Sequence, residues 1–145
     1  KVFVSSDGTE TVLCNRSDGI AINGLKKFGI RVIIISTETN QVVKIRGKKL
    51  GIETYFGICN KKEFLKDFII KNKLDIENII YVGNDINDLG AIRLTKFSIC
   101  PSDSHFEVKQ NVSYILKTKG GDGVLREIAE KVLNINLINL LGYDN

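Results

Sequence analysis

Three oxygen-bearing side chains stand close together in the middle of this sequence and could bind a metal ion. Asn84 and Asp85 come soon after a run of apolar residues, and Asp88 follows three positions after Asp85. Carboxylate and amide oxygens are the hard ligands that Mg²⁺ prefers. Asn and Asp also form turns and helix caps, so a turn that begins the next helix is the alternative interpretation.

Polar turns also follow two other predicted strands. Ser36 and Thr37 come after the β-branched run 32–35, and Lys61 comes after a predicted strand near residues 55–56. The carboxyl ends of parallel strands meet in one crevice of a doubly wound sheet. Hydroxyl groups, an ammonium group and metal ligands together are typical of phosphoryl-transfer sites. Taken singly, the hydroxyls are better explained by a helix cap and the lysine by a solvated surface; the three together favour a phosphate site.

Strand and helix patterns alternate along the chain. We expect strands at 32–35, 55–56, 79–82, 97–100 and 112–116, and helices at 18–28, 40–50, 60–69, 88–94 and 124–133. This alternation predicts an α/β fold, a doubly wound parallel sheet with helices on both faces. The sequence leaves the role of the apolar segment 135–141 open; in a purely structural module it would serve, with the hairpin, in contacts between subunits.

Residues 2–13 alternate around an Asp-Gly turn and predict a β-hairpin. A two-stranded ribbon is marginally stable alone. We therefore expect the hairpin to pair with other copies of the chain in an oligomer.

The composition is that of one globular domain, residues 1–145, with 43% apolar and 26% charged residues. The net charge of +4 comes from scattered lysines, which predicts neither a nucleic-acid partner nor a membrane partner. The chain has three cysteines that lie far apart in the sequence and form no closely spaced pair: Cys14, Cys59 and Cys100. This pattern indicates reduced thiols in a cytoplasmic protein and no zinc site. His105 is the only histidine, which argues against a Ser-His-Asp site.

With these motifs in place, the chain resembles the haloacid dehalogenase-like (HAD) phosphatases. Within this family, the chain resembles a small group of phosphatases that lack a cap domain and act on 3-deoxy-sugar-acid phosphates. It includes the KDO 8-phosphate phosphatases, the N-acylneuraminate/KDN 9-phosphate phosphatases and the C-terminal domain of some CMP-sialic acid synthetases. The resemblance runs from Val2 to about Leu133 and rests on the hairpin, residues 16–19, 35–40, Lys61, 83–88 and 120–127. It implies a Rossmannoid fold in which the hairpin replaces a cap domain.

The resemblance also implies roles for individual residues. Ser36 and Lys61 match the catalytic hydroxyl and lysine that hold the phosphoryl group. Asn84, Asp85 and Asp88 match the magnesium ligands, with an amide where the family usually has its first Asp. The implied substrate contacts are Thr37, Glu38, Asp18 and Arg126.

Two of these contacts bear on the substrate and the assembly. Glu38 stands where the KDO branch tends to have Arg, which favours an acylneuraminate or KDN 9-phosphate over KDO 8-phosphate. Arg126 resembles a residue that homotetramers of this group direct toward an active site, often that of a neighbouring subunit.

The family's nucleophile belongs to an Asp-x-Asp motif, and no Asp-x-Asp occurs in these 145 residues. By the resemblance, that motif and its strand lie upstream of Lys1. The chain is then part of an active phosphatase that forms an aspartyl-phosphate, a domain of a CMP-acylneuraminate synthetase, or a homologue that has lost catalysis and serves in oligomerisation. A phospho-acceptor receiver domain would share the acidic sheet edge but does not account for the hairpin or for residues 120–127.

Overall fold

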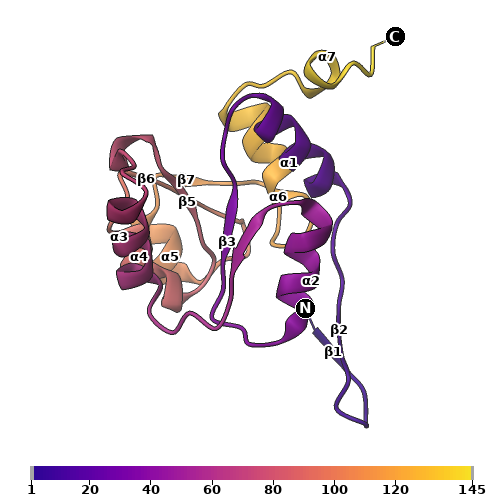
Figure 1. Cartoon of the computed structure of the whole chain (residues 1–145), viewed down its shortest axis with the longest axis vertical. Coiled ribbons are helices and arrows are strands. Elements are labelled where there is room, and N and C mark those ends of the chain that lie inside the picture. Colours follow the sequence, from indigo (N-terminus) through magenta and orange to yellow (C-terminus); the bar gives the residue numbers. More distant parts are fainter. Residues whose placement is uncertain (1, 145) are drawn as a thin grey trace.

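Strands and helices alternate along the chain, as the sequence predicts (Figure 1). The computed structural model describes residues 2–144. The strands are β1 (Val2–Val4), β2 (Glu10–Val12), β3 (Ile33–Ile35), β4 (Glu53–Tyr55), β5 (Ile80–Val82), β6 (Phe97–Cys100) and β7 (Tyr114–Ile115). The α-helices are α1 (Ser17–Lys27), α2 (Gln41–Leu50), α3 (Lys61–Lys71), α4 (Leu89–Ile92), α5 (Phe106–Asn111), α6 (Val124–Glu127) and α7 (Leu137–Leu141). The predicted α/β class is confirmed.

The parallel strands form two sheets rather than one continuous sheet. Strand β3 pairs with β4, and β5, β6 and β7 form a second sheet in that order. The hairpin β1–β2 forms a separate antiparallel pair in which Phe3 lies opposite Thr11. No ladder joins β3 to β5 within residues 2–144.

The predicted capping residues at the start of two helices, and at the end of one of them, are confirmed. The Asn40 side chain accepts a hydrogen bond from the Val42 amide, and the Asn60 side chain accepts one from the Glu63 amide. Gly51 ends α2 in the left-handed conformation, with φ of 62°. This conformation has little steric cost for glycine, because glycine lacks a Cβ atom.

Other elements differ from the sequence prediction. The helix expected at 88–94 is a 3-10 turn (Ile86–Asp88) followed by the short α4, and the helix expected at 124–133 continues from α6 as a π-helical turn (Ile128–Val132). Helix α5 was not predicted from the sequence. Only Val108 of its six residues is buried, so its apolar pattern is too weak to indicate a helix.

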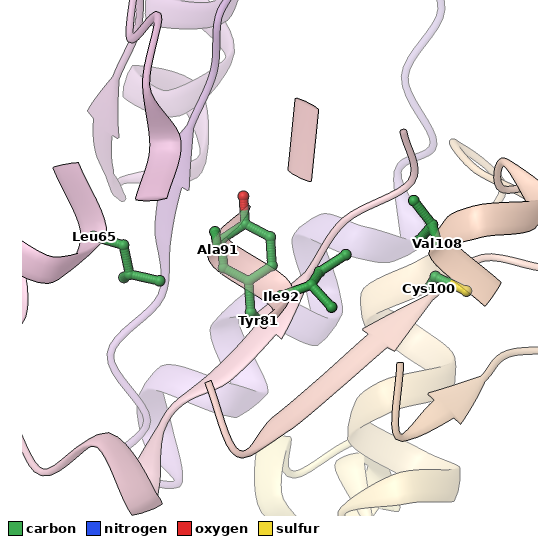
Figure 2. Close-up of a cluster of buried hydrophobic side chains, with 6 residues drawn as sticks. All are labelled: Leu65, Tyr81, Ala91, Ile92, Cys100 and Val108. Carbon is green, nitrogen blue, oxygen red and sulfur yellow. The ribbon is translucent and has the colours of Figure 1, made fainter. Parts of the chain in front are cut away.

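The core around β5 holds the elements of the polar loops in place. Figure 2 shows its buried members, which come from α3, β5, α4, β6 and α5: Leu65, Tyr81, Ala91, Ile92, Cys100 and Val108. Ile35 of β3 packs against this cluster from the other sheet. The two sheets are therefore connected through side chains.

The C-terminal segment, whose role the sequence left open, packs against α1. Ile135 and Leu137 are buried with Ala21 and Leu25 of that helix. Gly24 of α1 makes this approach possible, since a Cβ atom there would lie 2.2 Å from Leu137 Cδ2. Residues 135–141 thus complete a part of the core that α1 and α6 begin (Figure 1).

The hairpin β1–β2 extends away from the rest of the molecule (Figure 1). Its apolar side chains Phe3 and Val4 are 61% and 68% exposed. The Asn40 Nδ2 group donates a 2.7 Å hydrogen bond to Glu10 Oε2 and links the hairpin to the segment after β3. No helix within residues 2–144 has the length and apolar character needed to cross a bilayer.

We predict that Gly24→Ala destabilises the fold by about 1–3 kcal/mol, because the added methyl group overpacks the contact with Leu137. The matched control is Gly19→Ala in the same helix, where the new Cβ atom would lie an ordinary 3.5 Å from Leu50 Cδ2. That substitution is expected to be neutral or to stabilise by up to about 1 kcal/mol. Urea unfolding followed by circular dichroism measures both changes, and equal stability of the two variants contradicts the prediction.

Candidate functional site

The structure brings together the polar segments that follow β3, β4 and β5. The Asn87 side chain, after β5, donates a 3.3 Å hydrogen bond to Thr37 Oγ1, after β3. Lys61 is the first residue of α3, which follows β4, and its Nζ atom lies 2.7 Å from Asp88 Oδ1. Hydroxyl, ammonium and carboxylate groups from three neighbouring segments therefore share one region.

The Asp88 carboxylate is the centre of this region and accepts four hydrogen bonds. Its Oδ1 atom accepts from Lys61 Nζ at 2.7 Å and from the Tyr81 hydroxyl at 2.8 Å. Its Oδ2 atom accepts from the backbone amides of Asn84 and Asp85 at 2.9 and 3.2 Å. Asp88 is only 2% exposed, so these donors replace the water that a carboxylate otherwise needs.

The backbone at Gly83 allows the turn to fold this closely. A Cβ atom there would lie 2.6 Å from Asp88 Cβ, closer than real side chains come. Glycine at this position lets the end of β5 contact Asp88 directly. The Asp85 side chain caps the 3-10 turn at the Ile86 amide. The capping interpretation of this turn is thus confirmed for Asp85.

Lys61 is held in position by the packing of its helix. Tyr55 of β4 packs against Phe64 and Phe68 of α3, with ring centroids 4.9 and 5.5 Å apart. The Lys61 side chain is about 10% exposed, and only one of its three ammonium hydrogens is needed for Asp88. The others remain available to an anion at the site.

The electrostatics of the site favour an ionised Asp88. Burial by itself raises the pKa of this carboxyl group, but the hydrogen bonds from Lys61 and from the Asn84 amide outweigh burial, and the pKa lies below its ordinary value. Burial and the adjacent carboxylate raise the pKa of Tyr81, so its hydroxyl stays protonated and donates. The region therefore contains a fixed carboxylate and ammonium pair.

The turn after β3 presents two hydroxyl groups. Ser36 Oγ accepts a 3.1 Å hydrogen bond from the Glu38 amide, and Thr37 Oγ1 accepts from Asn87. Both hydroxyl hydrogens can still donate to an anion. Glu38 Oε1 accepts hydrogen bonds from the amides of Thr39 and Asn40, which fixes the turn.

The oxygen ligands available for a metal ion are Asn84 and Asp85, which are exposed. Within residues 2–144, no three Asp, Glu, His or Cys side chains are arranged to hold a metal ion. Mg²⁺ often takes one or two protein carboxylates and completes its shell with water and phosphate oxygens. The donors present therefore fit part of a Mg²⁺ site. Asp88 was also predicted to be a metal ligand. To take that role, one of its carboxylate oxygens must bind the metal ion while it still accepts hydrogen bonds from its donors.

Asp18 and Arg126, predicted to contact the substrate, lie together at the start of α6. Asp18 Oδ1 accepts a 2.9 Å hydrogen bond from the Leu125 amide, and burial raises the pKa of this carboxyl group. Arg126 pairs with Glu130 and lines a hollow of about 450 Å³ with Ser17 and Tyr114. None of their side-chain hydrogen bonds in the described part of the chain joins them to the loops around Asp88.

Sequence reasoning missed two polar contacts of the site. Tyr81 was counted only as an apolar strand residue, and Asn87 had no assigned role. The signal for Tyr81 is a hydroxyl group inside a strand predicted to be buried, which must find a partner. Asn87 gave no comparable signal, because its contact with Thr37 joins residues far apart in the chain.

Several known proteins resemble this chain in sequence and fold. The family model of haloacid dehalogenase-like hydrolases matches residues 35–128. A HAD-family hydrolase structure from Streptomyces avermitilis is 37% identical, with a TM-score of 0.90 over 94% of this chain and 79% of that chain. The 3-deoxy-D-manno-octulosonate 8-phosphate phosphatase from Moraxella catarrhalis, solved with magnesium, phosphate and KDO, is 29% identical, with a TM-score of 0.89 over 99% and 83% of the two chains.

A third relative is a much longer protein. The N-acylneuraminate cytidylyltransferase A of Danio rerio is 27% identical over 92% of this chain, which spans only 31% of that protein.

The chain belongs to the haloacid dehalogenase-like hydrolase family. This confirms the family that the sequence motifs indicated.

We predict that Asp88 makes fold stability depend on acid pH. Because its folded-state pKa lies below the ordinary value of 3.8, its stabilisation is present above that pH and is lost as the pH falls through the folded-state pKa. Asp88→Asn should lose about 3 kcal/mol of stability at pH 7 and should show a weaker loss of stability between about pH 5 and about pH 2. Urea unfolding across this pH range tests the prediction.

Asp67→Asn, at an exposed position in α3, is the matched control and should keep the pH profile of the parent chain. If Asp88→Asn follows the same profile as the parent, Asp88 is not the titrating group.

Proposed function

We propose that this chain is part of a Mg²⁺-dependent phosphatase that hydrolyses a 3-deoxy-sugar-acid phosphate. The observation that carries the proposal is the Lys61–Asp88 pair beside the Thr37–Asn87 hydrogen bond. Together these contacts bring the hydroxyl, ammonium and oxygen groups of three loops to one region. Such groups stabilise the negative charge of a transferring phosphoryl group. Family membership supports the same chemistry.

The nucleophile in this proposal is an Asp upstream of residue 1. Its carboxylate oxygen attacks phosphorus, the bond from phosphorus to the sugar oxygen breaks, and a second upstream Asp gives its proton to that oxygen. The second Asp then takes a proton from water, which attacks the aspartyl-phosphate and releases inorganic phosphate. In this chain, Ser36 and Thr37 donate to the phosphoryl oxygens and Lys61 steadies their charge.

The proposed metal ligands in this chain are Asn84 and Asp85, and Asp88 where it shares an oxygen with its donors. A bound divalent cation would neutralise part of the charge on the phosphoryl group. The amide of Asn84 carries no charge, so the site has one negative charge fewer than a pair of carboxylates would give. The magnesium ion in the Moraxella catarrhalis phosphatase supports this choice of metal.

We propose an acylneuraminate or KDN 9-phosphate as the substrate, rather than KDO 8-phosphate, and a cytoplasmic location. Glu38 supports this choice by its position beside Ser36, where the KDO branch tends to have Arg. Ser36 and Glu38 also line a hollow of about 290 Å³ between the hairpin, β3 and α2, which could accommodate the sugar. The likeness to an acylneuraminate cytidylyltransferase is in keeping with such a sugar.

The test uses the parent protein that includes the upstream Asp pair. With Mg²⁺ it should release phosphate from N-acetylneuraminate 9-phosphate faster than from KDO 8-phosphate, and EDTA should stop the reaction. Lys61→Ala and Asp85→Ala should each lower kcat/KM at least about 100-fold, because each removes a group that stabilises the transferring phosphoryl group. Lys66→Ala, at an exposed position in α3, is the control and should be unchanged.

A second candidate function is a non-catalytic oligomerisation domain of a CMP-acylneuraminate synthetase. The specific observation in its favour is the match of 92% of this chain to a cytidylyltransferase of which the chain spans only 31%. A parent protein that releases no phosphate from either substrate, with Mg²⁺ present, favours this candidate and contradicts the first.

Both candidates include a homotetramer assembled through the hairpins. The exposed Phe3 and Val4 support this proposal, because apolar side chains on a projecting ribbon gain stability when another chain covers them. We predict that Val4→Lys converts the assembly into smaller species in sedimentation velocity. Ile45→Lys, which changes an apolar residue that is 65% exposed on α2, should leave the assembly intact. A parent chain that sediments as a monomer contradicts the proposal.

A further inference from the structure

Two apolar side chains lie exposed beside the proposed metal ligands. Ile86 follows Asp85 directly and begins the 3-10 turn, and Phe106 begins α5. Each of these two side chains is 59% exposed. Acidic residues are favoured in the first turn of a helix, so the local backbone does not call for an apolar side chain at either position.

The backbone joins the segments that carry these two side chains. The His105 amide, in the loop after β6, donates a 3.0 Å hydrogen bond to the Asn84 carbonyl oxygen, and α5 contacts the 3-10 turn. Strands β5 and β6 are parallel neighbours, so both segments lie at the carboxyl edge of one sheet, where α/β proteins bind their ligands. Ile86 and Phe106 therefore border the region that contains the proposed metal and phosphate groups.

The loop before α5 is also held on its other side. Asp103 Oδ1 accepts a 2.7 Å hydrogen bond from the Gly120 amide. The Phe106 ring packs against the His105 ring, with the ring centroids 5.1 Å apart. A loop that is held in this way keeps its side chains in place before a ligand arrives, which lowers the entropy cost of binding.

His105 adds a hydrogen-bond donor to this apolar border. Its side chain is exposed, and its Nδ1 atom accepts a 3.2 Å hydrogen bond from the Glu107 amide. Because Nδ1 accepts, the ring N–H is on Nε2, where it can donate to a ligand. One donor beside two apolar side chains matches an N-acyl group, which carries a carbonyl oxygen and a methyl group.

We propose that Ile86, His105 and Phe106 bind the N-acyl group of the substrate. Nε2 of His105 donates to the acyl carbonyl oxygen, and the acyl methyl group packs against Phe106 and Ile86. This inference rests on the proposed function and narrows its substrate class to the N-acylneuraminate 9-phosphates. KDN 9-phosphate carries a hydroxyl group in place of the N-acyl group and has no methyl group to bury there.

The test compares two substrates that differ only in this group. The parent protein, with Mg²⁺, should have a kcat/KM for N-acetylneuraminate 9-phosphate at least about fourfold higher than for KDN 9-phosphate, and Phe106→Ala should lower this ratio about fourfold. Ile86→Ala and His105→Ala should lower it as well, because each removes another contact of the acyl group. Phe28→Ala, at the end of α1, is the matched control and should keep the ratio, since Phe28 is also 59% exposed.

A second measurement does not need turnover. Saturation-transfer NMR of free N-acetylneuraminate with the same protein should give its strongest signal at the acetyl methyl protons, and Phe106→Ala should remove this enhancement. An unchanged kcat/KM ratio in Phe106→Ala, or a methyl signal no stronger than that of the ring protons, overturns the proposal. A change in the sedimentation of Phe106→Ala assigns this face to a second copy of the chain and also overturns it.

The two measurements separate this inference from the proposed function. A protein that releases no phosphate but gives a methyl signal dependent on Phe106 supports the acyl site and counts against the phosphatase. Phosphate release from both substrates with equal kcat/KM supports the phosphatase and overturns the acyl site. The absence of both phosphate release and the methyl signal contradicts both.

Discussion

The arrangement of the site depends on one buried carboxylate. Asp88 accepts hydrogen bonds from Lys61, from Tyr81 and from two backbone amides, and so connects β5, the turn after it and α3. A buried charge is tolerated only when it is fully partnered. Each of these groups is therefore held in place by the need to satisfy the same side chain, and Gly83 allows the required close approach.

This carboxylate links stability to the proposed chemistry. The ion pair fixes the position of Lys61 but uses only one of its donors, so the ammonium group remains able to bind a phosphoryl oxygen. The exposed Asn84 and Asp85 then lie on the outer side of the same turn, where a metal ion and water can reach them. The hydrogen bonds on the inner side of this turn would hold the proposed metal ligands at a fixed distance from Lys61.

The parallel strands of the described residues form two sheets, which are joined by the packing of Ile35 of β3 against the cluster around Tyr81 of β5. The helices and the C-terminal segment lie on the outside of the molecule (Figure 1). Helix α7 packs on α1 through Gly24. The inner edges of β3 and β5 are less well covered.

The sequence by itself determined the α/β alternation, the hairpin turn, the caps Asn40 and Asn60, and the polar turns after β3 and β5, because these follow from local periodicity and turn chemistry. It also determined the family through its motifs. Only the tertiary structure decided that Tyr81 and Lys61 share Asp88, that Asp18 of α1 accepts a hydrogen bond from α6, and that residues 135–141 pack on α1. These contacts join residues far apart in the chain, and their geometry depends on packing that no local pattern encodes.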